Sequence, residues 1–131
     1  MINSIETARS LIEKEYCIPG EIVLRIFTRP PFTLGDVPPF TLENIPGDAF
    51  LIITNKRLFY LTNSYCNVIV LRFISEVSVH YDYGSRNSSN FVTMRFPAGD
   101  TSGGGSSHSY DFLRKSDAEE AFKLIMKNLV S

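Results

Sequence analysis

At 131 residues, with 44% hydrophobic side chains, the chain has the length and apolar content of one domain with a core of ordinary size. Its 13 basic and 14 acidic residues are spread evenly and leave a formal charge of −1. This balance excludes the strongly basic surface of a nucleic-acid-binding protein, so we expect no nucleic-acid partner. The 10 Phe and 6 Tyr, without any Trp, favour strands over a helical bundle.

The two cysteines, Cys17 and Cys66, lie too far apart in the sequence for a zinc-binding spacing. Only His80 and His108 are available to complete such a site, so we expect no metal and no cofactor, and we interpret both cysteines as buried or half-buried thiols. The first residues lack the basic and apolar regions of a signal peptide, and apolar runs are too short to span a membrane. We therefore expect a cytoplasmic protein, with the nucleus or the periphery of a membrane as alternatives.

Residues 1–18 have the pattern of a short helical extension. Asn3 and Glu6 form a capping pair. The apolar residues that follow at helical spacing are Ile5, Ala8, Leu11, Ile12 and Tyr16. Pro19-Gly20 predicts the end of this helix, and residues 21–27, rich in β-branched and aromatic side chains, predict a first strand.

Residues 28–47 differ in character, because prolines cluster there and one pentapeptide occurs twice. Pro30-Pro31-Phe32-Thr33-Leu34 recurs as Pro38-Pro39-Phe40-Thr41-Leu42. Proline removes backbone donors and restricts the preceding residue to extended geometry, which predicts a long, stiffened loop inserted between strands. Loops of this length inside compact domains are often functional.

Alternating and β-branched residues downstream predict six further strands, at 49–54, 58–62, 68–71, 74–81, 91–96 and 109–113. Between the first two of these, we expect Asn55 to adopt the left-handed conformation of a tight hairpin turn. Clusters of Gly, Ser and Asn predict a turn at 84–89 and a flexible loop at 97–107.

Residues 116–130 predict a C-terminal helix. Ser116 and Glu119 form a capping box. An apolar stripe at helical spacing follows, made of Ala118, Ala121, Phe122, Ile125 and Leu129. The chain is therefore predicted to be a single α+β, mainly β, domain over residues 1–131, with about seven antiparallel strands, this helix as a cap and the short N-terminal helix.

This order of elements resembles the pleckstrin-homology-like (PH-like) barrel, and residues 47–62 are similar to the GRAM domain. A glycine opens a strand there, Thr54-Asn55-Lys56-Arg57 matches the family's Thr-Asn-x-Arg turn, and an apolar strand returns. Residues 71–77 and 92–112 continue the resemblance. The insertion is similar to that of relatives of the WW-domain-binding-protein-2 type, although the tyrosine of their Pro-Pro-x-Tyr ligands is absent here. The split GLUE domain of the endosomal sorting machinery is a further similar family.

The resemblance implies phosphoinositide binding at a basic loop after the first strand. That loop begins with Arg29, but it also holds the acidic residues Asp36, Glu43 and Asp48. This is the wrong balance for holding a multiply charged phosphate through charge-assisted hydrogen bonds. The candidate lipid-binding residues are therefore those of a different basic patch, namely Lys56, Arg57, Arg72 and Arg86. Solvated charges at turns and strand edges are the alternative interpretation.

The duplicated pentapeptide is the more distinctive candidate for function. Prolines limit the entropy lost on docking, which favours a protein partner. The candidate contacts are the apolar side chains of the two copies, Phe32, Leu34, Phe40 and Leu42. Two alternatives stay open, in which the phenylalanines fold back over an open barrel edge or insert into a membrane.

The motifs argue against catalysis. Gly103-Gly104-Gly105 lacks the Lys-Ser/Thr of a phosphate-binding loop, and no nucleophile elbow frames Ser107-His108-Ser109. We therefore expect that the chain is not an enzyme. The sequence predicts a non-catalytic protein–protein interaction module, an adaptor on a PH-like scaffold that uses the 28–47 loop or a groove of the barrel. The alternative is a peripheral membrane domain that binds a phospholipid headgroup.

Overall fold

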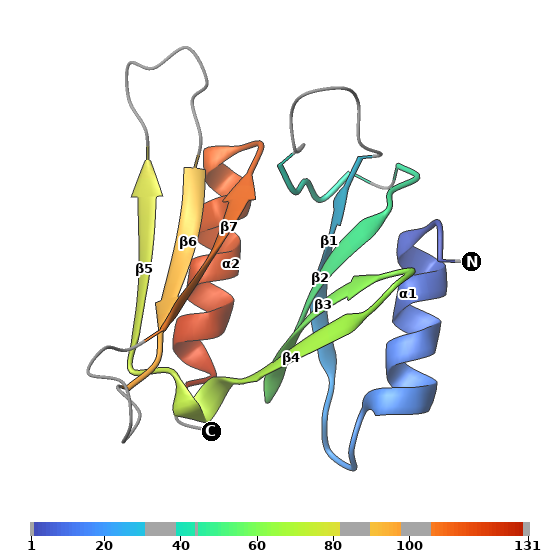
Figure 1. Cartoon of the computed structure of the whole chain (residues 1–131), viewed down its shortest axis with the longest axis horizontal. Coiled ribbons are helices and arrows are strands. Elements are labelled where there is room, and N and C mark those ends of the chain that lie inside the picture. The colour runs from blue at the N-terminus through green and yellow to red at the C-terminus, as the bar shows by residue number, and fades with distance from the viewer. Residues whose placement is uncertain (1, 31–38, 44, 82–89, 98–105, 130–131) are drawn as a thin grey trace.

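Two antiparallel sheets form the body of the structure, as Figure 1 shows. The computed structural model describes residues 2–30, 39–43, 45–81, 90–97 and 106–129. The first sheet has the order β1 (Val23–Arg29), β2 (Ala49–Thr54), β3 (Arg57–Thr62) and β4 (Cys66–Val70). The second has the order β5 (Glu76–Tyr81), β6 (Asn90–Arg95) and β7 (Ser107–Phe112). Within the described residues, the predicted mainly β fold of seven antiparallel strands is confirmed.

Helices flank the two sheets. Helix α1 (Ile5–Leu11) continues into a π-helical turn (Ile12–Tyr16) before β1, and α2 (Lys115–Lys127) follows β7. A 3-10 turn (Leu71–Phe73) joins β4 to β5 and so connects the sheets. The predicted short N-terminal helix and C-terminal helix are both present. Neither described helix is long and apolar enough to cross a membrane.

The main core lies between the two sheets and beneath α2. Its largest fully buried side chains include Phe27, Leu51, Leu58, Met94 and Phe112. A second apolar cluster lies on the outer face of the first sheet, where α1 covers Phe50, Ile52 and Phe59. Because the first sheet is covered on both faces, all six residues of β2 are buried. This explains why β2 is a continuous apolar run in the sequence, without the alternation of a strand that faces water on one side.

Part of the proline-rich segment belongs to the barrel. Thr41 forms an antiparallel bridge with Thr28 of β1, and Phe40 forms a parallel bridge with Phe112 of β7. The Phe40 amide donates to the Asp111 carbonyl at 2.9 Å, and the Phe40 carbonyl accepts from the Leu113 amide at 2.8 Å. The second copy of the pentapeptide therefore joins the edges of the two sheets, whereas the sequence predicted loop throughout 28–47. Residues 31–38, which include the first copy from Pro31 onward, lie outside the described residues.

Both predicted helix caps are wrong. Ser4, with extended backbone, caps α1 in place of Asn3, because its hydroxyl accepts from the Thr7 amide at 3.1 Å. Helix α2 begins at Lys115 with Arg114 as its N-cap, so Ser116 already lies in the first turn and makes no capping bond. Strand β7 ends at Phe112, and α2 begins three residues later at Lys115, one residue before the predicted cap Ser116.

The prediction for Asn55 is also wrong, because no described residue other than glycine has a positive φ. The Asn55 side chain instead ties the β2–β3 turn to the linker before β1. Its Oδ1 accepts from the Ile22 amide at 2.8 Å, and its Nδ2 donates to the Gly20 carbonyl at 3.1 Å. The hydroxyl of Thr54 supports the same turn by accepting from the amides of Lys56 and Arg57.

Candidate functional site

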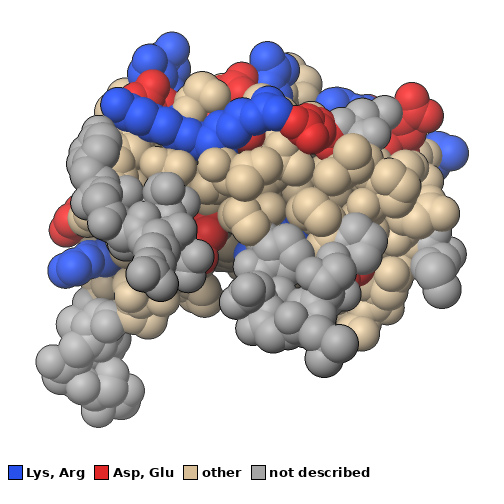
Figure 2. All heavy atoms as spheres, turned by 90° about the horizontal axis from the view of Figure 1, so that it is seen from above, with Lys and Arg blue, Asp and Glu red and all other residues tan. Residues whose placement is uncertain are grey.

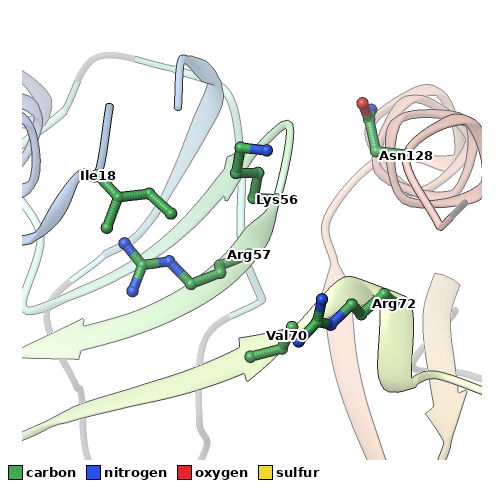
Figure 3. A pocket seen from close by; sticks show the side chains of 6 residues that line it. All are labelled: Ile18, Lys56, Arg57, Val70, Arg72 and Asn128. Carbon is green, nitrogen blue, oxygen red and sulfur yellow. The ribbon is translucent and has the colours of Figure 1, made fainter. Parts of the chain in front are cut away.

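A pocket of about 280 Å³ lies where the β2–β3 turn, the end of β4 and the end of α2 approach one another. We call it the basic pocket, and its lining residues are Ile18, Lys56, Arg57, Val70, Arg72 and Asn128. Figure 3 shows Ile18 and Lys56 on one side of the pocket and Asn128 on the other. The pocket thus combines residues from both ends of the chain with residues from its middle.

Three of the lining residues are cationic, namely Lys56, Arg57 and Arg72, and the register of the β3–β4 hairpin brings their backbones close together. Arg57 is the cross-strand partner of Val70, so the start of β3 lies beside the end of β4. The Leu71 amide donates to the Lys56 carbonyl at 3.0 Å, which fixes the β2–β3 turn against the 3-10 turn that carries Arg72. Cross-strand neighbours lie about 5 Å apart, so the backbones of the three residues are close although the residues are distant in sequence.

Arg57 is held by a buried carboxylate. Its Nη2 donates to Glu21 Oε1 at 2.5 Å, and its Nε donates to Glu21 Oε2 at 3.0 Å. Glu21 also accepts from the Thr54 hydroxyl at 2.6 Å and from the Ile18 amide at 3.1 Å. Burial alone raises the pKa of Glu21, but the hydrogen bonds from Arg57 and Thr54 outweigh it, so the net pKa lies below its ordinary value. The carboxylate therefore stays ionised and fixes the Arg57 guanidinium at the edge of the pocket.

The other two cations have no such partner. Among the described residues, neither Lys56 nor Arg72 forms an ion pair, and no acidic side chain lines the pocket. The Arg72 guanidinium lies 4.9 Å from the centre of the Phe73 ring, a cation–π contact that leaves its donors available. Asn128 donates through Nδ2 to the Leu124 carbonyl at 2.7 Å, which satisfies one carbonyl at the negative end of α2. The pocket therefore has a positive electrostatic character suited to an anionic group.

The face at the top of Figure 1 carries charged side chains of both signs. Figure 2 shows this face, with basic and acidic side chains interspersed along one edge and mostly uncharged residues in the described surface beside them. The residues of the basic pocket belong to the end of α2, the β2–β3 turn and the 3-10 turn, which lie toward the other end of the molecule in Figure 1. The three cations of the basic pocket are therefore a local concentration of positive charge in a chain whose formal net charge is −1.

Three of the predicted lipid-binding residues, Lys56, Arg57 and Arg72, lie around this one pocket. Arg86 lies outside the described residues. Sequence reasoning missed Ile18 and Asn128, which reach the pocket only through tertiary packing. It also missed Glu21, for which the only signal is an acidic residue directly after Pro19-Gly20.

The predicted protein contacts are placed differently. Phe32 and Leu34 lie outside the described residues. Phe40 is fully buried, with its ring 5.9 Å from Tyr60 in an edge-to-face arrangement, so it is not accessible to a partner in this conformation. Leu42 is half-buried against the main core. The position of Phe40 matches the alternative interpretation, in which the ring covers an open barrel edge.

Arg29, at the start of the predicted lipid loop, is engaged with aromatic rings. Its guanidinium lies 4.3 Å from the centre of the Phe40 ring, and it donates to the Tyr60 hydroxyl at 3.1 Å. This cation therefore helps to fix the bridge formed by the second pentapeptide. Its guanidinium contacts these aromatic side chains, whereas the family resemblance implied that the loop would bind phosphate.

The remaining chemical groups show no assembled site within the described ranges. No group of three His, Cys, Asp or Glu side chains there is arranged to hold a metal ion. Cys17 and Cys66 are free and half-buried, as predicted, and burial raises the pKa of both thiols. The Ser109 hydroxyl bonds to Thr93 at 2.9 Å, and the His108 ring packs edge-to-face on Phe96. The two residues are thus occupied in separate local contacts.

Comparison with known proteins identifies the fold and does not identify a function. No protein-family model matches the chain, and no curated protein matches it. Among solved structures, the Vps36 N-terminal PH domain is similar, with a TM-score of 0.53 over 88% of this chain and 86% of that one. The two sequences are 15% identical, so the similarity shows the fold alone. The fold is PH-like.

Proposed function

We propose that this chain is a non-catalytic binding module that holds a phosphate-bearing headgroup of a membrane phospholipid in the basic pocket. The observation that supports this most is the lining of the pocket: Lys56, Arg57 and Arg72 come from different elements, and no acidic side chain joins them in the described residues. PH-like folds serve as scaffolds for binding lipids or proteins, and here the site chemistry favours an anion. The role is that of a peripheral membrane domain.

Each cation contributes differently to binding a phosphate. Arg72 presents a planar guanidinium that can form two parallel hydrogen bonds to phosphate oxygens. Lys56, on the β2–β3 turn, acts as a mobile point charge. Arg57 is neutralised in part by Glu21, so it contributes orientation and shape more than net charge. A volume of about 280 Å³ is near the lower end of the range for ligand pockets and suits a small polar headgroup.

The finer assignment to the GRAM type rests on the Thr54-Asn55-Lys56-Arg57 turn and stays a proposal. A protein partner at Phe32, Leu34 and Leu42 also stays a prediction from the sequence. We rank it second because the burial of Phe40 removes one of the two aromatic contacts on which it depended.

Titration with inositol hexakisphosphate, a soluble and highly charged headgroup analogue, tests the proposal. We expect saturable binding by calorimetry, with amide shifts in NMR spectra confined to the pocket. The double variant Lys56→Gln with Arg72→Gln should bind about a hundredfold more weakly, because each charge-assisted hydrogen bond contributes about 1.5 kcal/mol. Lys123→Gln, an exposed lysine of α2 outside the pocket lining, is the matched control and should bind normally. Equal affinity in the double variant and the control would show that the anion binds elsewhere.

A further inference from the structure

Four exposed apolar side chains border the basic pocket. We call them the apolar rim, and they are Tyr16 (40% exposed), Ile18 (49%), Val68 (44%) and Phe73 (57%). They come from the π-helical turn, the linker before β1, strand β4 and the 3-10 turn. Exposed apolar residues are ordinary when scattered, but several around one charged pocket indicate an interaction surface.

Two members of the rim are placed by the pocket residues themselves, and the other two by Phe59, which packs beside Arg57. Ile18 lines the pocket itself, and Phe73 packs against the guanidinium of Arg72. Val68 is the cross-strand partner of Phe59, and the Tyr16 ring lies 6.1 Å from the same Phe59. The Arg57 guanidinium also lies over Phe59, at 4.9 Å from its ring centre. Tyr16 and Val68 are therefore next to the Arg57 side of the pocket, and Phe73 is on the Arg72 side.

The rim is held in place by the buried network around Glu21. Arg57 Nη2 donates to the Tyr16 carbonyl at 2.6 Å, while the Ile18 amide donates to Glu21. On the other side, the Ile74 amide donates to the Leu71 carbonyl at 3.0 Å and closes the turn that carries Phe73. These bonds fix the backbone on both sides of the pocket, so the backbone loses little conformational entropy when a partner buries the exposed side chains.

We infer that the apolar rim inserts into the interfacial layer of an anionic bilayer while the basic pocket holds a headgroup. This inference rests on the proposed function and adds the surface by which the membrane itself is bound. Cations at the depth of the phosphates, with aromatic and aliphatic side chains beyond them, are the composition that binds such a surface. A protein partner would need about 800 Å² on each side, whereas four half-exposed side chains provide a small part of that area.

Vesicle binding separates the rim from the pocket. The test variant is Tyr16→Ser with Val68→Thr, which keeps all charges and changes no residue that lines the pocket. The matched control is Leu113→Thr, because Leu113 is at least as exposed and precedes α2, whereas Asn128 of the pocket ends it, about 20 Å along the helix axis. Each protein is mixed with phosphatidylcholine vesicles, with and without phosphatidylserine, and separately with inositol hexakisphosphate.

We expect the rim variant to lose about tenfold in partition onto the phosphatidylserine vesicles, while its affinity for inositol hexakisphosphate stays that of the unchanged protein. Unchanged vesicle binding in the rim variant, with headgroup binding intact, would overturn the inference and leave the proposed function standing. If the unchanged protein binds neither probe, the proposed function fails and the inference fails with it. If sedimentation velocity shows a dimer that the rim variant abolishes, the rim is a contact between copies and the membrane inference is wrong.

Discussion

The ring of Phe40 provides a direct test of whether the proline-rich segment is part of the core. It is fully buried, lies 6.1 Å from Phe112 and 6.2 Å from Tyr110, and is covered by Arg29. Phe40→Ala removes this ring from a site whose backbone is fixed by hydrogen bonds to both sheets, so the surroundings cannot collapse easily into the space. We expect a loss of about 3–5 kcal/mol in the free energy of unfolding.

Urea unfolding followed by far-ultraviolet circular dichroism measures this loss. With a slope of about 1.5–2 kcal/mol per molar urea, the midpoint should fall by about 1.5–3 M. Phe73→Ala is the matched control, because it removes the same ring from an exposed position and should cost less than about 1 kcal/mol.

The two variants distinguish a core residue from a binding residue. A cost for Phe40→Ala as small as that for Phe73→Ala would refute the assignment of Phe40 to the core. The second pentapeptide would then be detached in solution, and its ring would again be a candidate contact for a protein partner.

Three further changes test individual contacts. Gly47→Ala should cost about 1–3 kcal/mol in urea unfolding, because a Cβ there would lie 2.2 Å from Thr28 Oγ1 and 2.5 Å from the Arg29 carbonyl; an unchanged midpoint would contradict this close approach. Glu21→Gln should cost about 3 kcal/mol, since it leaves the largely buried Arg57 without its counter-charge; a fully stable variant would show that the pair is dispensable. Burial raises the pKa of Asp117 above the value it has in the unfolded chain, so the free energy of unfolding falls as the pH rises between the two pKa values. Asp117→Asn should remove this fall, which urea midpoints at acidic and neutral pH measure. An unaltered pH profile in the variant would refute the argument.

The sequence predicts most of the fold because each strand carries its own local signal. Residues 49–54 and 58–62 were predicted as strands, and β2 and β3 cover nearly the same positions. The C-terminal helix follows from an apolar stripe whose members Ala118, Ala121 and Ile125 are all buried beneath it. The caps fail because local patterns such as Ser116 with Glu119 compete with the position at which the chain leaves β7, which only tertiary structure fixes.

The duplicated pentapeptide shows a different limit of sequence reasoning. Its two copies are identical, so composition and spacing cannot distinguish Phe32 from Phe40. The second copy is placed by tertiary contacts, because Thr28 pairs with Thr41 and the Asp111 carbonyl accepts from the Phe40 amide at the edges of the two sheets. The basic pocket was partly predictable, because Lys56, Arg57 and Arg72 flank one predicted hairpin. The contribution of Asn128, at the end of α2, was not.

The Thr-Asn-x-Arg turn, which carries the family resemblance, is occupied mainly by structural tasks. Thr54 closes the turn and bonds Glu21, Asn55 ties the turn to the linker, and Arg57 is paired with the buried carboxylate. Each of these three residues therefore has a reason to be present in a protein that binds no lipid at all. The variable position, Lys56, is the one whose charge has no ion-pair partner among the described residues. If the basic pocket binds an anion, its specificity must then come from Lys56 and Arg72, which the shared pattern leaves unspecified, and two chains with the same turn can differ in what they bind.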